Sequence, residues 1–121
     1  MKYLTTPVIY LKNEDFDKTG QLINPSIPKD KPVIIMIQAN YCGYCTMAKP
    51  DFQKFASKSN GKYVCATIQG DGDKKLYKKL KKIYPQFQYY PSYIAYKNGE
   101  FVRDYTEGRD VKSLLTFAES I

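Results

Sequence analysis

The sequence contains no histidine and no tryptophan, and only three of its 121 residues are cysteine. Without histidine, the chain cannot form a Cys-His or Ser-His catalytic pair or a zinc site with histidine ligands. The longest aliphatic run, residues 33–37, is short, whereas about 20 apolar residues are needed to cross a bilayer. These absences exclude several classes of enzyme and predict no membrane-spanning helix.

Positive charge comes almost entirely from lysine, with 17 lysines against two arginines and a net charge of +7. Because recognition of nucleic-acid bases depends heavily on arginine, we expect no specific nucleic-acid binding, and the charge favours acidic protein partners. Six lysines lie between residues 74 and 82, where the pattern indicates a solvated helix face or a docking surface for an acidic partner. The Lys-, Ile- and Tyr-rich composition is typical of an AT-rich genome, such as that of a large DNA virus.

The length predicts one domain, residues 1–121, because a chain of this size cannot form two separately stable cores. We expect residues 1–7 to pack loosely and residues 20–31, which contain Pro25 and Pro28, to form an irregular connection with room for one short helix. No secretory leader is recognised at the start, which predicts an intracellular, cytoplasmic location, or a virion if the source is viral. A monomer is favoured.

Apolar patterns predict an α/β fold with a mixed sheet flanked by helices. Residues 33–37 show no alternation and are expected to be a central strand buried on both faces. Asn98-Gly99 predicts a tight hairpin. The expected strands cover residues 8–11, 32–39, 63–68, 92–97 and 100–105, and the expected helices begin near Asn13, Cys42, Leu76 and Val111.

Cys42 and Cys45 directly follow the predicted central strand and open a predicted helix. Their spacing and the odd cysteine count argue against a disulfide-stapled secreted scaffold. A helix N-terminus favours an anion, so the Cys42 thiol should ionise more readily than that of an ordinary cysteine, and Cys45 could resolve the mixed disulfide that Cys42 forms. An inert disulfide or half of a zinc site are the alternatives. Cys65 is expected to be a buried, unreactive thiol, with a regulatory cysteine as the alternative.

The segment Tyr41-Cys42-Gly43-Tyr44-Cys45 resembles the aromatic-Cys-Gly-x-Cys motif of thioredoxin and its protein disulfide isomerase relatives. Pro50 is similar to the proline within that family's helix, and Tyr90-Pro91-Ser92 to its cis-proline loop. Lys97-Asn98-Gly99-Glu100 and Gly108 fall where the family has a hairpin turn and a late glycine. The resemblance covers nearly the whole chain and implies a thioredoxin fold, with a cis-proline loop and a C-terminal β-hairpin and helix.

The resemblance implies a thiol-disulfide oxidoreductase of protein disulfides, with Cys42 as nucleophile and Cys45 as resolving thiol. It implies no bound cofactor or metal, and recycling by an upstream redox partner. Reduction, oxidation and isomerisation all stay open, and the alternative function is a thioredoxin-fold binding protein or virion-associated structural component with little turnover. The residues implied to bind substrate or shape the site are Tyr41, Gly43, Tyr44, Tyr90 and Pro91.

Four positions depart from the family's usual pattern. Tyr41, Tyr44 and Thr46 stand where the family often has tryptophan, proline and lysine, which can alter redox potential and partner choice. Met36 replaces a buried acid, and the lysine that usually pairs with this acid aligns with Thr67. The absence of the acid at position 36 and the absence of the lysine at position 67 are consistent with each other, because either charge buried alone would cost several kcal/mol.

Overall fold

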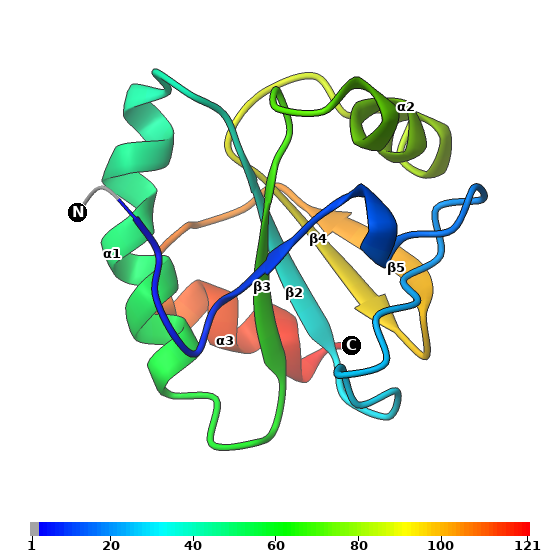
Figure 1. The fold of residues 1–121 in the computed structure, drawn as a ribbon. Helices are drawn as coiled ribbons and strands as arrows, with labels where there is room; N and C mark the ends of the chain where they lie inside the picture. Colours follow the sequence, from blue (N-terminus) through cyan, green and yellow to red (C-terminus); the bar gives the residue numbers. More distant parts are fainter. Residues whose placement is uncertain (1–2) are drawn as a thin grey trace.

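The computed structural model describes residues 3–121 and confirms the predicted mixed α/β fold (Figure 1). The strands are β1 (Ile9–Leu11), β2 (Val33–Gln38), β3 (Val64–Gln69), β4 (Ser92–Lys97) and β5 (Glu100–Tyr105). The helices are α1 (Gly43–Ser57), α2 (Lys74–Ile83) and α3 (Val111–Glu119), and a 3-10 turn, η1 (Asn13–Asp15), follows β1.

The five strands form one sheet in the order β1-β3-β2-β4-β5. β1 and β2 run parallel to β3, whereas β4 is antiparallel to both β2 and β5. All six residues of β2 are buried, as predicted for a strand whose hydrophobic residues do not alternate. The predicted hairpin is present, since Asn98 and Gly99 have φ angles of 55° and 78° in the left-handed region that this turn requires.

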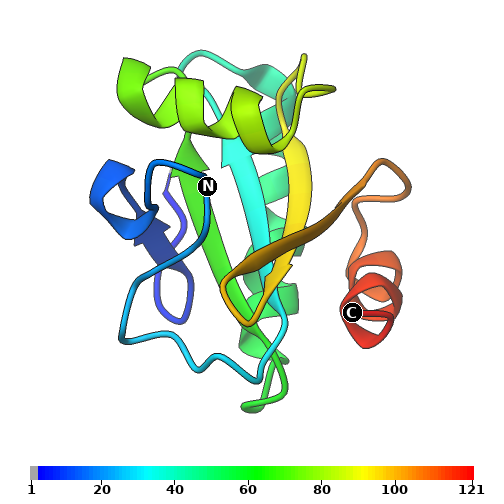
Figure 2. The same ribbon diagram turned by 90° about the vertical axis from the view of Figure 1, so that its right-hand side faces the viewer.

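Helices cover both faces of the sheet (Figures 1 and 2). Because side chains alternate along a strand, Ile34 and Met36 of β2 enter the core shared with α1 and α3, together with Phe52. Ile35 enters the second core, which contains Leu80 of α2. No helix within residues 3–121 is both long enough and apolar enough to span a bilayer.

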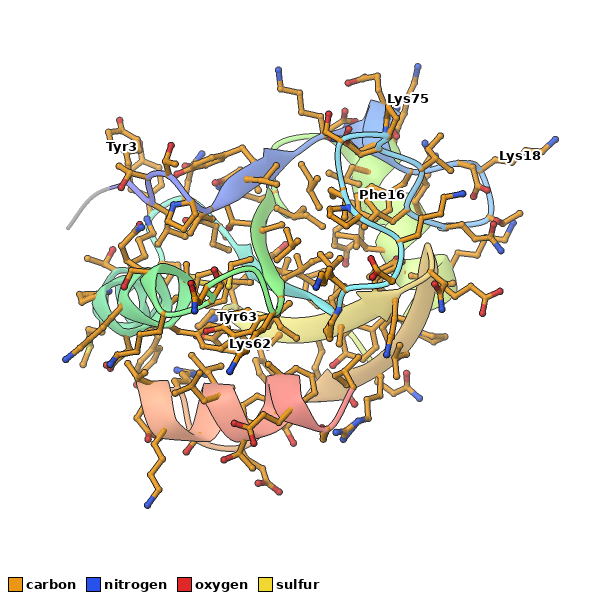
Figure 3. All side chains as sticks on the ribbon, turned by 90° about the horizontal axis from the view of Figure 1, so that it is seen from below. Tyr3, Phe16, Lys18, Lys62, Tyr63 and Lys75 are labelled. Carbon is orange, nitrogen blue, oxygen red and sulfur yellow. A yellow bond between two sulfur atoms is a disulfide. The ribbon has the colours of Figure 1, made fainter. Side chains whose placement is uncertain are left out.

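The segment from β1 to β2 is mostly irregular. Residues 20–31 form an irregular connection with turns, as expected, but the short helix that was considered there is absent. Pro25 and Pro28 cannot donate the backbone hydrogen bonds of a helix. The helix expected near Asn13 is only the single 3-10 turn η1. Phe16, which follows this turn, points inward in Figure 3 and is 3% exposed, so the irregular segment is anchored by core contacts.

The beginning of the described chain is anchored to α1. Leu4 is only 2% exposed. The Thr5 N–H donates to Gln53 Oε1 at 2.8 Å, and Gln53 Nε2 donates to the Thr5 carbonyl at 3.0 Å. This part of the 1–7 segment therefore packs more tightly than expected, because a side chain far along the sequence satisfies its backbone. Residues 1 and 2 lie outside the described residues.

The lysine-rich face of α2 contains two lysines that are held in place. Lys79 Nζ donates to the carbonyls of Asn13 and Phe16 at 3.0 and 2.7 Å. Lys81 Nζ donates to the two backbone carbonyls of Pro85 and Phe87. These lysines fasten η1 and the loop after α2 to the helix. The other lysines of the face, all exposed, are Lys74, Lys75, Lys78 and Lys82.

Candidate active site

Cys42 and Cys45 lie where β2 leads into α1. Cys42 is the N-cap residue of α1, and its sulfur accepts a hydrogen bond from the Cys45 N–H at 3.1 Å. The two sulfurs are bonded as a disulfide, with Cα atoms 5.2 Å apart. The helix therefore begins at the motif as predicted, and a backbone donor of its first turn points at the Cys42 sulfur.

The two cysteines differ in exposure. Cys42 is half-buried, whereas Cys45 is only 1% exposed and belongs to the same core as Met36 and Ala48. A large reactant can therefore approach the sulfur of Cys42 but not that of Cys45.

Three residues of the motif lie at the surface around Cys42. Tyr41 and Tyr44 have exposed fractions of 105% and 68%. A Cβ atom added to Gly43 would meet no heavy atom within 4 Å outside residues 42–44, so the space next to Gly43 is open. Tyr41 also has a φ of 56°, a left-handed conformation that is costly for a bulky residue. The motif thus presents two exposed aromatic side chains and an uncrowded glycine next to the half-buried Cys42.

Tyr90 and Pro91 belong to the loop before β4. Ser92 pairs with Ile37 near the end of β2, which places this loop beside the segment that carries the cysteines. The Tyr90–Pro91 peptide bond is cis, and Pro91 is buried. Burial raises the pKa of Tyr90, and the nearby carboxylate of Asp71 raises it further. The topology thus brings the Tyr90–Pro91 loop and the segment that carries Cys42 and Cys45 close together, as the sequence motifs indicated.

The absence of a side chain at Gly70 leaves space for the Tyr90 ring. A Cβ atom at Gly70 would lie 2.6 Å from Tyr90 Cε1 and 3.1 Å from Ile37 Cγ2, both closer than ordinary contact. Only glycine therefore leaves room for the ring in its observed position. No motif marks Gly70 in the sequence, because its requirement comes from a residue that approaches from another loop.

Asp71 joins two loops beside the site. Its carboxylate accepts hydrogen bonds from the Asn40 N–H at 3.0 Å and from Gln69 Nε2 at 2.6 Å. Asn40 lies between β2 and Cys42, so this contact ties the cysteine-bearing loop to the end of β3. The Asn40–Asp71 bond joins residues 31 positions apart, and no local pattern could have revealed it.

Met36 and Thr67 form a neutral pair in the core below the cysteines. They are partners in the register of β2 and β3, and both are fully buried, which confirms the predicted alignment. Thr67 Oγ1 donates to the Met36 carbonyl at 2.8 Å and accepts from Gln38 Nε2 at 2.7 Å. The buried polar residues among positions 3–121 include no charged side chain. A neutral hydrogen-bond chain therefore stands where the family usually has an ion pair.

Cys65 lies in β3, buried and outside the disulfide. Burial raises the pKa of its thiol, so the reactive thiolate is disfavoured. Its burial agrees with the expected unreactive thiol.

In the reduced protein, we expect iodoacetamide to label Cys42 on the order of tenfold faster than Cys45 or Cys65 near neutral pH, because only Cys42 is both accessible and at a helix N-terminus. Brief labelling followed by mass spectrometry locates the modified residue. The urea-unfolded protein, in which all three thiols should react at similar rates, is the control. Preferential labelling of Cys65 would contradict the expectation.

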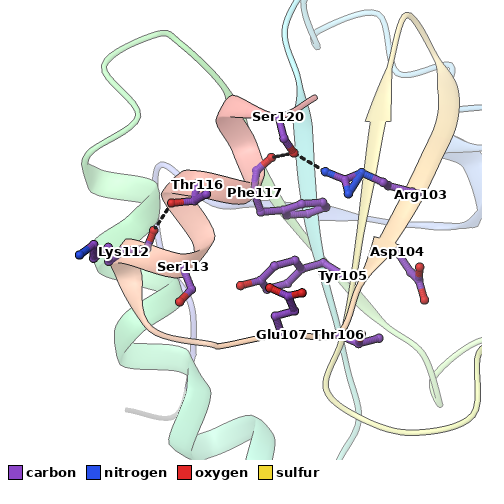
Figure 4. A pocket seen from close by; sticks show the side chains of 10 residues that line it. All are labelled: Arg103, Asp104, Tyr105, Thr106, Glu107, Lys112, Ser113, Thr116, Phe117 and Ser120. Carbon is purple, nitrogen blue, oxygen red and sulfur yellow. Dashed lines mark hydrogen bonds between the residues drawn. The ribbon is translucent and has the colours of Figure 1, made fainter.

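Two hollows adjoin the predicted site residues. One is lined by Cys42, Gln38 and Lys49 among others, and the other lies beside Pro91. Figure 4 shows a neighbouring hollow between β5 and α3, which shares Tyr105, Thr106 and Glu107 with the hollow beside Pro91 and in which the rings of Tyr105 and Phe117 stack with centroids 4.5 Å apart. Within residues 3–121, no group of three or more His, Cys, Asp or Glu side chains is placed to hold a metal ion.

The Cys-x-x-Cys disulfide lies at the N-terminus of a helix, and a loop that contains a proline lies alongside it on a mixed sheet. This arrangement defines a thioredoxin-fold protein with a site for thiol-disulfide exchange. The thioredoxin family model matches residues 7–120. The chain therefore belongs to the thioredoxin family. The family and the Cys42–Cys45 pair support thiol-disulfide oxidoreductase chemistry in general.

Relatives and solved structures agree with this assignment. The thioredoxin-like protein 453L of Invertebrate iridescent virus 6 is 44% identical over 132 residues, covering 96% of this chain and 95% of that protein. Mitochondrial thioredoxin of Mus musculus is 26% identical over 95 residues, covering 78% of this chain and 54% of that protein. The structure of the Trx4 domain of ERdj5 has a TM-score of 0.70 at 18% identity, and the match covers 93% of each chain. The chain thus spans nearly all of the viral relative and about half of the mitochondrial one.

Proposed function

We propose that this protein is an oxidoreductase of protein disulfides, with Cys42 as nucleophile and Cys45 as resolving thiol. The observation that carries the proposal is the asymmetry of the pair. Cys42 is accessible at the N-cap of α1 and its sulfur receives the Cys45 N–H, whereas Cys45 is buried. An anionic Cys42 sulfur would be stabilised by that donor and by the helix dipole.

In the reducing direction, the Cys42 thiolate attacks one sulfur of the substrate disulfide. A mixed disulfide forms, and the first substrate thiolate leaves and takes up a proton from water. The Cys45 thiol then loses its proton and attacks the Cys42 sulfur, which closes the Cys42–Cys45 disulfide and releases the second substrate thiolate. The substrate gains two electrons and the protein loses two, which an upstream redox partner restores without a bound cofactor.

The surface around Cys42 supports a large substrate. Tyr41 and Tyr44, the neighbours of Cys42 and Gly43 in the motif, are exposed, and the space next to Gly43 is open. An extended substrate segment would pair with the Tyr90 backbone as an added strand next to Pro91. The net charge of +7 favours acidic substrates and partners.

Insulin disulfide reduction tests the proposal. With dithiothreitol as the electron source, wild type should accelerate the reaction and Cys42→Ser should fall to the rate of dithiothreitol alone. Cys65→Ser, which changes a buried cysteine outside the pair, is the matched control and should stay active. A wild type no faster than dithiothreitol would favour the alternative of a binding or virion-associated protein with little turnover.

A further inference from the structure

A hollow between α2 and the loop before β4 has aromatic walls. Its volume is about 430 Å³, and its lining includes Tyr77 of α2 and Tyr90 of the loop. Tyr77 is 41% exposed and Tyr90 is half-buried, so a partner can reach both side chains. Both rings also contact the ring of the buried Phe87, with centroid distances of 5.9 Å for Tyr77 and 5.3 Å for Tyr90. Packing on the core thus holds both walls in place, which lowers the entropic cost of binding a side chain in the hollow.

The hollow adjoins the lysine-rich face of α2. Lys74 and Lys78 contribute to its lining. Lys74 lies three residues before Tyr77 and four before Lys78, the spacings that place side chains on the same side of a helix. Within the described part of the chain, neither lysine has a hydrogen bond or an ion pair. The ammonium groups next to the aromatic walls are therefore available to an acidic partner.

Two carboxylates also line the hollow, and both are bonded to the protein itself. Asp73 is the N-cap of α2, where its Oδ1 accepts from the Lys75 N–H at 2.8 Å. Asp71 accepts from the Asn40 N–H and from Gln69 Nε2. The partial positive charge of the helix N-terminus offsets part of the charge of Asp73. Because α2 contains six lysines and no acidic residue, the charge of the region stays positive.

We propose that this hollow and the lysines beside it form a docking site for an acidic protein segment, which inserts one apolar or aromatic side chain between Tyr77 and Tyr90. The carboxylates of the segment would lie against Lys74 and Lys78. An aromatic anchor pocket with complementary charge around it is typical of the energetic centre of a protein interface. Docking needs no redox step, so the inference goes beyond the proposed oxidoreductase activity. Tyr90 directly precedes Pro91, so a protein that reacts at Cys42 can cover the hollow at the same time.

A protein segment is favoured over a nucleic acid as the occupant. The chain has only two arginines, whereas base recognition depends heavily on arginine. Single-stranded nucleic acid stacks successive bases on a series of aromatic rings, and the described residues that line this hollow supply two such rings. A closed pair of walls suits one inserted side chain better than a strand of stacked bases.

The test uses the full chain in its disulfide form and cysteine-free peptides, in which a central Phe or Ala is flanked on both sides by Glu, Gln or Lys. NMR titration gives the Kd of each peptide, including weak ones. For wild type, the Glu-flanked Phe peptide should bind about tenfold more tightly than the Glu-flanked Ala peptide, because the Phe ring leaves water. It should bind about threefold more tightly than the Gln-flanked Phe peptide, since exposed ion pairs are weak. The Lys-flanked peptides should bind least.

Tyr77→Ala tests the aromatic wall and should bring the Phe-to-Ala ratio close to one. Tyr77→Phe keeps the ring and should keep the ratio, which separates the wall from any effect of the hydroxyl. Val102→Ala is the matched control, because Val102 has a similar exposed fraction of 44% but lies in β5, outside the lining. The NMR spectrum of each variant shows whether its fold is retained.

The double variant Lys74→Gln, Lys78→Gln tests the charges and should bring the Glu-to-Gln ratio close to one. The matched control is Lys54→Gln, Lys58→Gln, which removes the same charge from two exposed lysines at the C-terminal end of α1. This control should keep the ratio, because the proposed contacts are local. Equal losses in the two double variants would show that only long-range attraction is involved.

Equal Kd values for the Glu-flanked Phe and Ala peptides would overturn the docking site, and so would a Phe preference that Tyr77→Ala leaves intact. A thymidine oligonucleotide that binds the same residues more tightly than the Glu-flanked Phe peptide would overturn the assignment to a protein partner. The insulin assay on the same proteins separates this inference from the proposed function. If wild type reduces insulin but shows no Phe preference, only the docking site fails. If it binds the peptide as expected but reduces nothing, the docking site stands and the oxidoreductase function fails.

Discussion

Met36→Asp should lower the free energy of unfolding by about 3–5 kcal/mol at neutral pH, the cost of an unpaired buried charge. Met36 is fully buried, and burial would raise the pKa of the introduced carboxyl above its value in the unfolded chain. The folded state therefore binds the proton more tightly, and the loss of stability should grow as the pH rises from about 4. Urea midpoints measured at pH 5 and pH 8 would show the larger loss at pH 8.

Adding Thr67→Lys should recover part of this loss, because positions 36 and 67 are direct partners between β2 and β3. The recovery is incomplete, since lysine also removes the hydrogen bond that Thr67 receives from Gln38. A double-mutant cycle over the four proteins gives the coupling free energy. Coupling below about 0.5 kcal/mol would show that the two side chains do not meet.

Cys45→Ser should reduce multiple turnover on the order of 100-fold or more, because the mixed disulfide on Cys42 then has no internal thiol to resolve it. The trapped complex should accumulate, survive non-reducing electrophoresis and disappear on addition of dithiothreitol. Cys42→Ser is the matched control and should trap nothing, because Cys45 is buried. Equal trapping by both variants would contradict the assigned roles, and mass spectrometry of the trapped species identifies the substrate.

Much of the fold was predictable because its determinants are local. The uninterrupted apolar run of β2 indicated burial on both faces, and all six of its residues are buried. Asn98-Gly99 indicated the hairpin because few other residues adopt two successive left-handed conformations. The expectation at Asn13 was less accurate, since one polar turn signal cannot distinguish a helix from the 3-10 turn that formed.

The Cys42–Cys45 pair was evident from spacing and context, whereas the contacts that support the site were not. Tyr41 and Tyr44 are exposed, and their roles toward a substrate stay predictions. The Asn40–Asp71 hydrogen bond was not predictable, because it depends on segments that meet only in the folded chain.

The close approach of Gly70 to Tyr90 constrains how this protein can diverge. A side chain at position 70 would overlap the Tyr90 ring, and Ile37 closes the adjacent space. Relatives with a larger residue at position 70 should therefore carry a smaller residue at position 90, and relatives that keep the tyrosine should keep the glycine. The two positions are 20 residues apart in the chain, but they should change together during evolution.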